Sequence, residues 1–196
     1  MGVPFVGLTG GLGAGKSTAL AALERLGAVG LDTDAVVHEL YETAPVREAV
    51  RERWGAAVFA GERVDRGAIA RRTFADEQER TWLEELLWPL VGTRVGAFHD
   101  ELQLRAPPPV AGVVETPLLF EARVEGRFDA TIAIVADDCL RAERIAARGQ
   151  EELAARERRQ LSQEEKARRA SYVVVNDGSV AELEAKLAEI LRRLEA

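Results

Sequence analysis

The sequence has little of what membrane, secreted and zinc-binding proteins require. No apolar run approaches the roughly 18 residues that span a bilayer, and the first residues carry no cationic, signal-type segment. The one cysteine, Cys139, cannot form an internal disulfide, and the two histidines, His38 and His99, give no zinc-binding spacing. We therefore expect a cytoplasmic globular protein that has no membrane partner.

Lysine is also scarce, and acidic residues outnumber basic ones. The chain of 196 residues carries 26 Lys and Arg against 33 Asp and Glu, for a net charge of −7. This balance argues against a general affinity for nucleic acid, and it means that local, oriented donors must bind any phosphate ligand. Only Lys16, Lys166 and Lys186 are lysines, and Lys16 lies in a glycine-rich loop.

Short apolar runs alternate with helical patterns along the chain. This alternation predicts an α/β fold with a mainly parallel, five-stranded sheet flanked by helices. The length fits a single domain, 1–196. The expected strands are 3–9, 28–31, 110–114, 130–136 and 171–175, and the expected helices are 16–26, 138–148 and 180–194.

Two further regions are expected to be helical. Residues 35–105 form a helical insert, broken near Pro45 and between Gly61 and Gly67. Residues 150–169 are strongly charged, which predicts an exposed helix. Most of the aromatic and leucine side chains of the insert are expected to form a satellite core: Trp54, Phe59, Phe74, Trp82, Leu86, Leu87 and Trp88.

One motif indicates a ligand. Residues 10–17 match G-x-x-x-x-G-K-[ST] and lie between an expected strand and an expected helix. The glycines let successive backbone N–H groups face one anion, at the positive end of the helix. Lys16 can reach the terminal phosphates, and the Ser17 hydroxyl suits Mg²⁺. We infer that the chain binds a nucleoside triphosphate.

Carboxylates follow two other expected strands. Asp32 and Asp34 come after the second strand, and Glu115 comes after the third. The carboxyl ends of parallel strands share one edge, so we expect these side chains to converge with the glycine-rich loop. Asp32 can accept a proton from an attacking hydroxyl, although the aspartate pair fits helix capping equally well. Glu115 fits an outer-shell magnesium role or a simple strand-end carboxylate.

Arginines recur on one expected helix. Arg141, Arg144 and Arg148 share a face at i, i+3 and i+7. In small phosphoryl-transfer enzymes a mobile, arginine-bearing lid excludes water and neutralises developing charge. We expect one or two arginines of this region to act in that way and the others to be solvated.

Several longer stretches extend the motif. The chain has L-T-G-G-x-G-x-G-K-S-T at 8–18, Asp-Thr-Asp at 32–34, P-L-L-F-E at 117–121 and Asn-Asp-Gly at 176–178. Together these residues resemble the dephospho-coenzyme A kinase family over nearly the whole chain. The resemblance implies a P-loop kinase fold with a helical acceptor-binding insert at 35–105 and a lid at 141–169.

The resemblance also implies a reaction and its residues. ATP would phosphorylate the ribose 3′-hydroxyl of dephospho-CoA, the last step of coenzyme A synthesis, with Mg²⁺ as cofactor and a monomer as the favoured state. Asp32 would be the base, Lys16 and Arg144 would assist transfer, and Ser17 and Glu115 would serve the metal. The implied ATP-binding residues are Gly11, Gly13, Ala14, Gly15, Lys16, Ser17, Thr18, Arg148, Asn176 and Gly178.

Three positions depart from the family pattern. Trp88 stands where His is common, His38 where Arg is frequent, and Glu115 where Asp is usual. None of them lies in the glycine-rich loop or at Asp32, so an active enzyme is the favoured interpretation. Two alternatives stay open: a kinase for another nucleoside, nucleotide or small alcohol, and a non-catalytic nucleotide-binding module.

Overall fold

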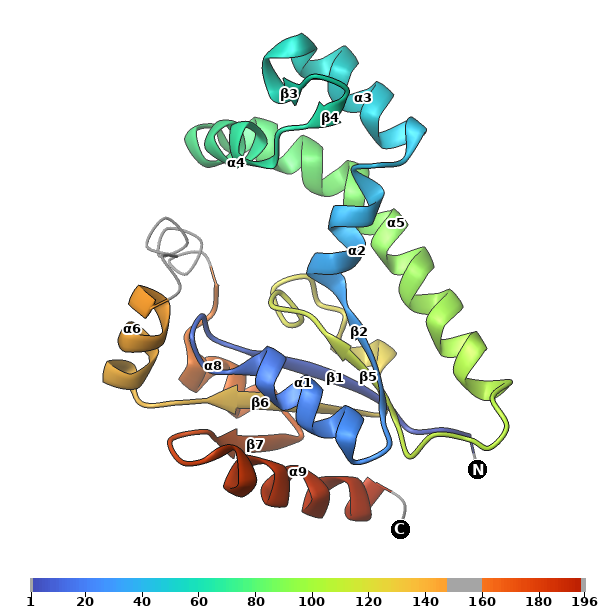
Figure 1. Cartoon of the computed structure of the whole chain (residues 1–196), viewed down its shortest axis with the longest axis vertical. Helices are drawn as coiled ribbons and strands as arrows, with labels where there is room; N and C mark the ends of the chain where they lie inside the picture. The colour runs from blue at the N-terminus through green and yellow to red at the C-terminus, as the bar shows by residue number, and fades with distance from the viewer. Residues whose placement is uncertain (1, 148–159, 195–196) are drawn as a thin grey trace. The chain divides into compact units, whose positions relative to one another are not determined.

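A computed structural model describes residues 2–147 and 160–194 of the chain (Figure 1). The chain divides into two compact units, Met1–Asp32 together with Phe98–Ala196, and Thr33–Ala97. Within the described residues, no helix combines the length and the apolar character that crossing a bilayer requires.

The first unit is built on a parallel sheet. Over the described residues, its five strands run in the order β2-β5-β1-β6-β7, and every neighbouring pair is parallel. The expected strands and the α/β fold class are therefore confirmed, with strand ends shifted by a few residues. The strands are β1 Phe5–Gly10, β2 Val29–Asp32, β5 Gly112–Glu115, β6 Ala130–Val135 and β7 Tyr172–Val175.

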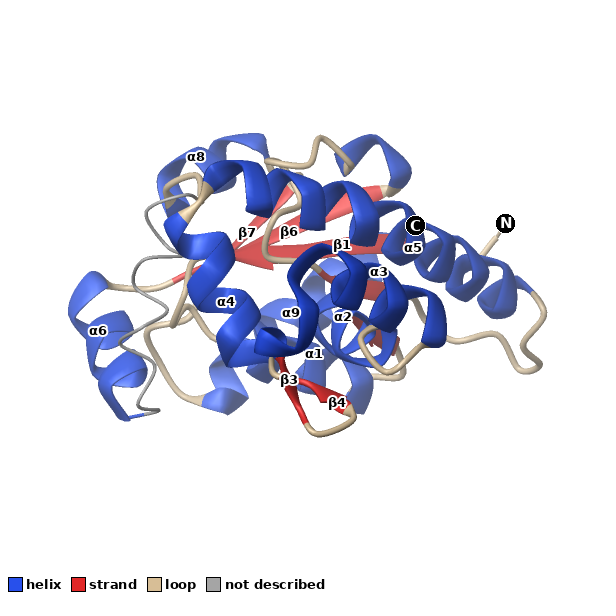
Figure 2. Cartoon of the chain, turned by 90° about the horizontal axis from the view of Figure 1, so that it is seen from above, coloured by secondary structure: helices blue, strands red, loops and turns tan. Residues whose placement is uncertain are grey.

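Helices cover both faces of this sheet. The helices that lie wholly within this unit are α1 Lys16–Arg25, α6 Asp138–Ala147, α8 Gln163–Arg169, α9 Val180–Leu194 and a short 3-10 helix, η2 Glu125–Arg127, as far as the described residues show. Helices α1 and α9 pack together on one face, and α8 packs against the other face over β6 (Figure 2). Val6, Leu8, Ile132 and Ile134 are fully buried between the sheet and the α1–α9 layer because alternate strand residues point to the same face.

In its described part, the expected helix over 150–169 is confirmed at Gln163–Arg169, which forms α8, but the expectation that it is exposed is wrong at Lys166. Residues 148–159 lie outside the described residues, and the Lys166 side chain is 0% exposed. The Lys166 ammonium donates to the Pro117 carbonyl oxygen and lies 3.0 Å from Glu121 Oε1. Two oxygens from the segment after β5 therefore make the burial of this charge possible.

The second unit is mainly helical. It contains α2 Thr33–Leu40, α3 Ala44–Trp54, the 3-10 helix η1 Gly55–Val58, α4 Arg66–Ala75 and most of α5 Glu77–Gln103, whose last residues belong to the first unit. It also contains a small antiparallel hairpin, β3 Phe59–Ala60 and β4 Arg63–Val64, which the sequence analysis missed. Gly61 turns this hairpin at φ +65°, a backbone conformation that favours glycine.

The second unit has its own core. The buried side chains are Tyr41, Val46, Val50, Trp54, Val58, Ile69 and Leu87, and Trp82 packs edge-on against Trp54 with ring centroids 4.9 Å apart. Phe74 and Trp88 are each 45% exposed, so the expectation that they join this core is wrong. Leu83, Leu86 and Leu87 of α5 pack in this core, and Trp88 lies beyond the edge of the helix face that they form.

Candidate active site

The loop between β1 and α1 has the shape of an anion-binding site. Gly13 and Gly15 adopt left-handed backbone conformations, at φ +74° and +96°. Gly15 is also the N-cap of α1, where no side chain makes a capping hydrogen bond and the first turn carries no acidic residue. The N–H groups and the positive end of α1 are therefore directed at the loop, where they suit a phosphate.

The polar residues of the motif lie at the start of α1. Lys16 Nζ donates to the Gly11 carbonyl oxygen at 3.2 Å, so this ammonium folds back over the loop that precedes it. Ser17 is exposed and Thr18 is half-buried, whereas Gly11 and Ala14 are buried. The structure thus brings together the loop residues that the sequence analysis selected.

Three other side chains hold the carbonyl groups of the same loop. Arg141 Nε donates to Leu12 O at 2.9 Å, Arg144 Nη1 donates to Gly13 O at 3.4 Å, and Asn176 Nδ2 donates to Ala14 O at 2.8 Å. Arg144 also donates from Nη2 to Asn176 O at 3.0 Å, which links two of the three. These residues follow β6, which is next to β1, and β7, which is next to β6, so both strands deliver them to the carboxyl end of the sheet.

Sequence analysis placed Arg144 and Asn176 at this site but left Arg141 out of the binding set. Its spacing one helical turn before Arg144 on α6 had placed it among the candidate arginines, but spacing alone did not show which of them reach the loop. Gly178 lies further along the loop before α9, where the side chain of Glu182 contacts it. Arg148 lies outside the described residues.

The predicted carboxylates stand at the ends of two neighbouring strands. Asp32 is the last residue of β2 and pairs in register with Glu115, the last residue of β5, which in turn pairs with Leu8 of β1. Glu115 is 5% exposed and Asp32 is half-buried. Asp34 is exposed in the first turn of α2, which begins at Thr33, so it lies inside this helix and not before it.

The oxygen donors near the loop fit a magnesium ion better than a softer metal. In the described part of the chain, no group of three or more His, Cys, Asp or Glu side chains is arranged to hold a metal. Mg²⁺ in nucleotide sites takes only one or two protein oxygens and completes its shell with phosphates and water. A hydroxyl at Ser17 and a carboxylate at Glu115 are compatible with that chemistry.

The P-L-L-F-E segment after β5 is held by a buried cation. The Pro117 carbonyl accepts hydrogen bonds from Lys166 and, at 3.4 Å, from Thr9 Oγ1, while Glu121 Oε1 accepts from Leu161 N at 2.8 Å. Burial lowers the pKa of Lys166 below its ordinary value of 10.5, and the charge and hydrogen bonding of Glu121 oppose this shift. The segment that continues from Glu115 is thus fixed to both β1 and α8.

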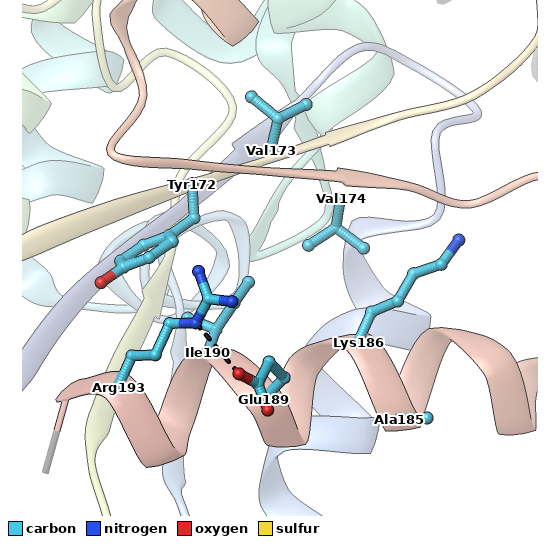
Figure 3. A pocket seen from close by; sticks show the side chains of 8 residues that line it. All are labelled: Tyr172, Val173, Val174, Ala185, Lys186, Glu189, Ile190 and Arg193. Atoms are coloured by element: carbon cyan, nitrogen blue, oxygen red, sulfur yellow. Dashed lines mark hydrogen bonds and ion pairs between the residues drawn. The ribbon is translucent and has the colours of Figure 1, made fainter.

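A surface hollow between β7 and α9 is a poor alternative site (Figure 3). Its lining includes Tyr172, Val174 and Ile190, and none of its residues belongs to the predicted set. Its charged groups have partners, since Arg193 pairs with Glu189 at 3.1 Å and Lys186 donates to Val175 O at 2.7 Å. The loop after β1 therefore remains the candidate active site.

Comparisons with known proteins agree with this geometry. The family model described as dephospho-CoA kinase matches residues 4–182. A dephospho-CoA kinase of Deinococcus radiodurans is 38% identical over 193 residues, which cover 97% of this chain and 92% of that protein. The crystal structure of TT1252 from Thermus thermophilus is 36% identical, covers 99% of each chain and superposes with a TM-score of 0.82.

A more distant structure supports the fold alone. A dephospho-CoA kinase from Campylobacter jejuni is 21% identical, with 97% of each chain covered and a TM-score of 0.63. The P-loop kinase fold that the sequence predicts is therefore confirmed.

Proposed function

This chain belongs to the dephospho-CoA kinase family, and we propose that the carboxyl edge of its sheet phosphorylates the ribose 3′-hydroxyl of dephospho-CoA from ATP. One observation carries the residue assignment. The phosphate loop and two carboxylates, Asp32 and Glu115, end adjacent strands of one sheet. Phosphoryl transfer needs these two kinds of group, donors for the triphosphate and an acceptor for the proton of the attacking hydroxyl.

On the nucleotide side, Lys16 and the loop N–H groups would bind the β- and γ-phosphates of ATP. Lys16 already lies over the loop, 3.2 Å from Gly11 O, so its charge is at the place where the phosphates would bind. Arg144 would stabilise the charge on the transferred group from α6, where its guanidinium contacts Gly13. Fixed donors of this kind stabilise charge without reorganising during the reaction.

On the acceptor side, Asp32 would orient the 3′-hydroxyl and accept its proton. The new bond forms between that oxygen and the γ-phosphorus, the bond from the γ-phosphorus to the bridging oxygen of ADP breaks, and the proton passes to the Asp32 carboxylate. Most of the rate enhancement would come from positioning the two substrates in line. The half-buried position of Asp32, at the end of β2, supports this role over the exposed Asp34.

Mg²⁺, when bound, would neutralise charge on the β- and γ-phosphates, with Ser17 supplying a direct oxygen and Glu115 acting through water. The helical region 35–105 would bind the acceptor. The lid expected over 141–169 stays a prediction, and so do the monomeric state and the cytoplasmic location.

An ADP-release assay tests the proposed acceptor. Purified protein is given ATP and Mg²⁺ with dephospho-CoA, AMP, nucleosides or shikimate, and formation of coenzyme A is measured by chromatography. We expect ADP and coenzyme A in equal amounts with dephospho-CoA, and much slower formation of both by Lys16→Ala prepared in the same way. Turnover with a different acceptor, and none with dephospho-CoA, would show that this other compound is the substrate. ATP binding without acceptor-dependent ADP would instead indicate a nucleotide-binding module.

A further inference from the structure

The phosphate loop is held by its outward-facing carbonyl groups. Three successive carbonyls, those of Leu12, Gly13 and Ala14, each accept a hydrogen bond from a side chain of another element. The C=O of one residue and the N–H of the next share a planar trans peptide unit and point in opposite directions. Fixing these carbonyls therefore fixes the direction of the N–H groups that follow them.

Arg141 makes the first of these contacts, and its own surroundings limit what else it can do. Its Nη1 lies 2.7 Å from Asp138 Oδ1, and the side chain is 12% exposed. The Arg141 charge also helps, after the Ser162 hydrogen bond, to lower the pKa of the Glu164 carboxyl on α8. Asp138 thus offsets part of the Arg141 charge and fixes the orientation of its guanidinium, whose Nε donates to the loop.

The loop glycines fit this contact. A Cβ atom at Gly11 would lie 3.1 Å from Arg141 Nη2, and one at Gly13 would lie 2.7 Å from the Arg141 backbone oxygen. A larger residue at Gly13 would meet the backbone of α6, and one at Gly11 would displace the Arg141 guanidinium, so the glycines allow the close approach. The glycines of the motif therefore allow α6 to pack closely against the phosphate loop.

We propose that Arg141 is a positioning residue, which with Arg144 and Asn176 pins the phosphate loop in the conformation that binds nucleotide. Arg141 acts through the Leu12 carbonyl and does not have to touch the phosphates. The loop is then ordered before ATP arrives, and the cost of ordering it does not reduce affinity. This role rests on the proposed function, because it assumes that the loop binds ATP.

Binding of ADP to three variants tests the role, with titration calorimetry in the presence of Mg²⁺. We expect Arg141→Met to bind ADP about tenfold more weakly, the effect of one charge-assisted hydrogen bond. Arg141→Lys keeps the charge but not the fork, so we expect it to be nearly as weak. The matched control is Arg25→Met, which removes an arginine paired with Glu184 on the surface between α1 and α9 and should bind normally.

Asp138→Ala gives a test of sign. This change removes a negative charge beside a phosphate site, so a purely electrostatic role of Arg141 predicts tighter ADP binding. The positioning role predicts weaker binding, because Arg141 loses the partner that orients it. The helix start should survive, since Asp137 Oδ1 accepts from Cys139 N at 2.9 Å.

Kinetics and unfolding complete the test. We expect the KM for ATP to rise with the ADP dissociation constant while the KM for dephospho-CoA and the urea midpoint change little. Wild-type affinity in Arg141→Met or Arg141→Lys, tighter binding in Asp138→Ala, or equal weakening in Arg25→Met would overturn the proposal. Weaker ADP binding in a protein that does not phosphorylate dephospho-CoA would instead leave the positioning role standing and refute the proposed function.

Discussion

The carboxyl edge of the sheet has two halves with opposite chemistry. After β1, β6 and β7 come hydrogen-bond donors, and Lys16, Arg141, Arg144 and Asn176 all contact carbonyls of the phosphate loop. After β2 and β5 come the carboxylates Asp32 and Glu115, paired in register. The strand order puts β1 next to β5 of the acidic half, so the loop that would bind ATP lies where donors and acceptors meet.

The difference between the halves explains how an acidic protein can bind a polyanion. A net charge of −7 repels a triphosphate at long range. The donor half supplies oriented hydrogen-bond donors within a few ångströms of the phosphates. At that distance their attraction exceeds the repulsion from the net charge of the protein.

The largest effect should come from the acidic half. Asp32→Asn should lower kcat by about 10²–10⁴-fold, the usual contribution of a general base, while ADP affinity stays near wild type. Stopped assays with dephospho-CoA measure the first quantity, and calorimetry measures the second. Asp34→Asn is the matched comparison and should keep most of its turnover. A larger loss of kcat in Asp34→Asn than in Asp32→Asn would show that Asp34 is the base.

Lys16→Ala tests the donor half. Removing this ammonium should weaken nucleotide binding and reduce kcat together, by about 10²–10³-fold in kcat/KM for ATP. The KM for dephospho-CoA should change little. If only that KM rose, Lys16 would act on the acceptor, and the division of the edge into two halves would fail.

Lys166 is a buried cation that holds the segment after β5 through Pro117 and Glu121. Because this contact is structural, its removal should reduce the stability of the fold. Lys166→Met leaves Glu121 without its ion-pair partner, and we expect a loss of about 3 kcal/mol in unfolding free energy. The double variant Lys166→Met/Glu121→Gln should recover part of that loss. Urea denaturation measures both, and a neutral single variant would contradict the assigned pairing.

The same pair has a pH dependence of known sign. Because burial lowers the pKa of Lys166 below 10.5, the unfolded chain binds more protons than the folded protein between the lowered value and 10.5. The contribution of Lys166 to the unfolding free energy therefore rises as pH increases through that window. The difference between wild type and Lys166→Met, measured by urea denaturation, should grow from neutral to alkaline pH.

The smallest effect should come from Glu115. Glu115→Gln should raise the Mg²⁺ concentration for half-maximal rate by about tenfold, as loss of an outer-shell ligand does. Glu115→Asp, which restores the residue usual in the family, should stay close to wild type. An unchanged Mg²⁺ requirement in Glu115→Gln would show that this carboxylate has only a structural role at the end of β5.

Much of the fold was predictable because the signals are local. Strands such as Ala130–Val135 are short apolar runs, and residues 10–17 carry every feature of the phosphate loop in consecutive positions. The hairpin around Gly61 was not predictable, because two-residue strands carry too little pattern. Trp88 was misjudged because hydrophobicity does not say which face of α5 is covered.

The site was predictable in part for the same reason. Arg144 and Asn176 were selected through the family resemblance, and both contact the loop. Lys166 was predicted to be exposed, and Arg141 belonged to a set of arginines of which the sequence could not say which ones act. Their positions depend on carbonyl oxygens far away in the chain, and no local pattern records such partners.

The sequence alone therefore determined that this chain has a phosphate loop at the end of a buried strand. The glycines, the lysine and the serine of that loop are consecutive or nearly so, and they shape and line the loop without distant partners. Tertiary structure alone decided what holds that loop. The contact between Arg141 and Leu12 joins residues 129 positions apart, and that between Asn176 and Ala14 joins residues 162 apart. Hydrogen bonds over such separations exist only after the parallel strands have aligned their ends, because only then do donor and acceptor come within reach.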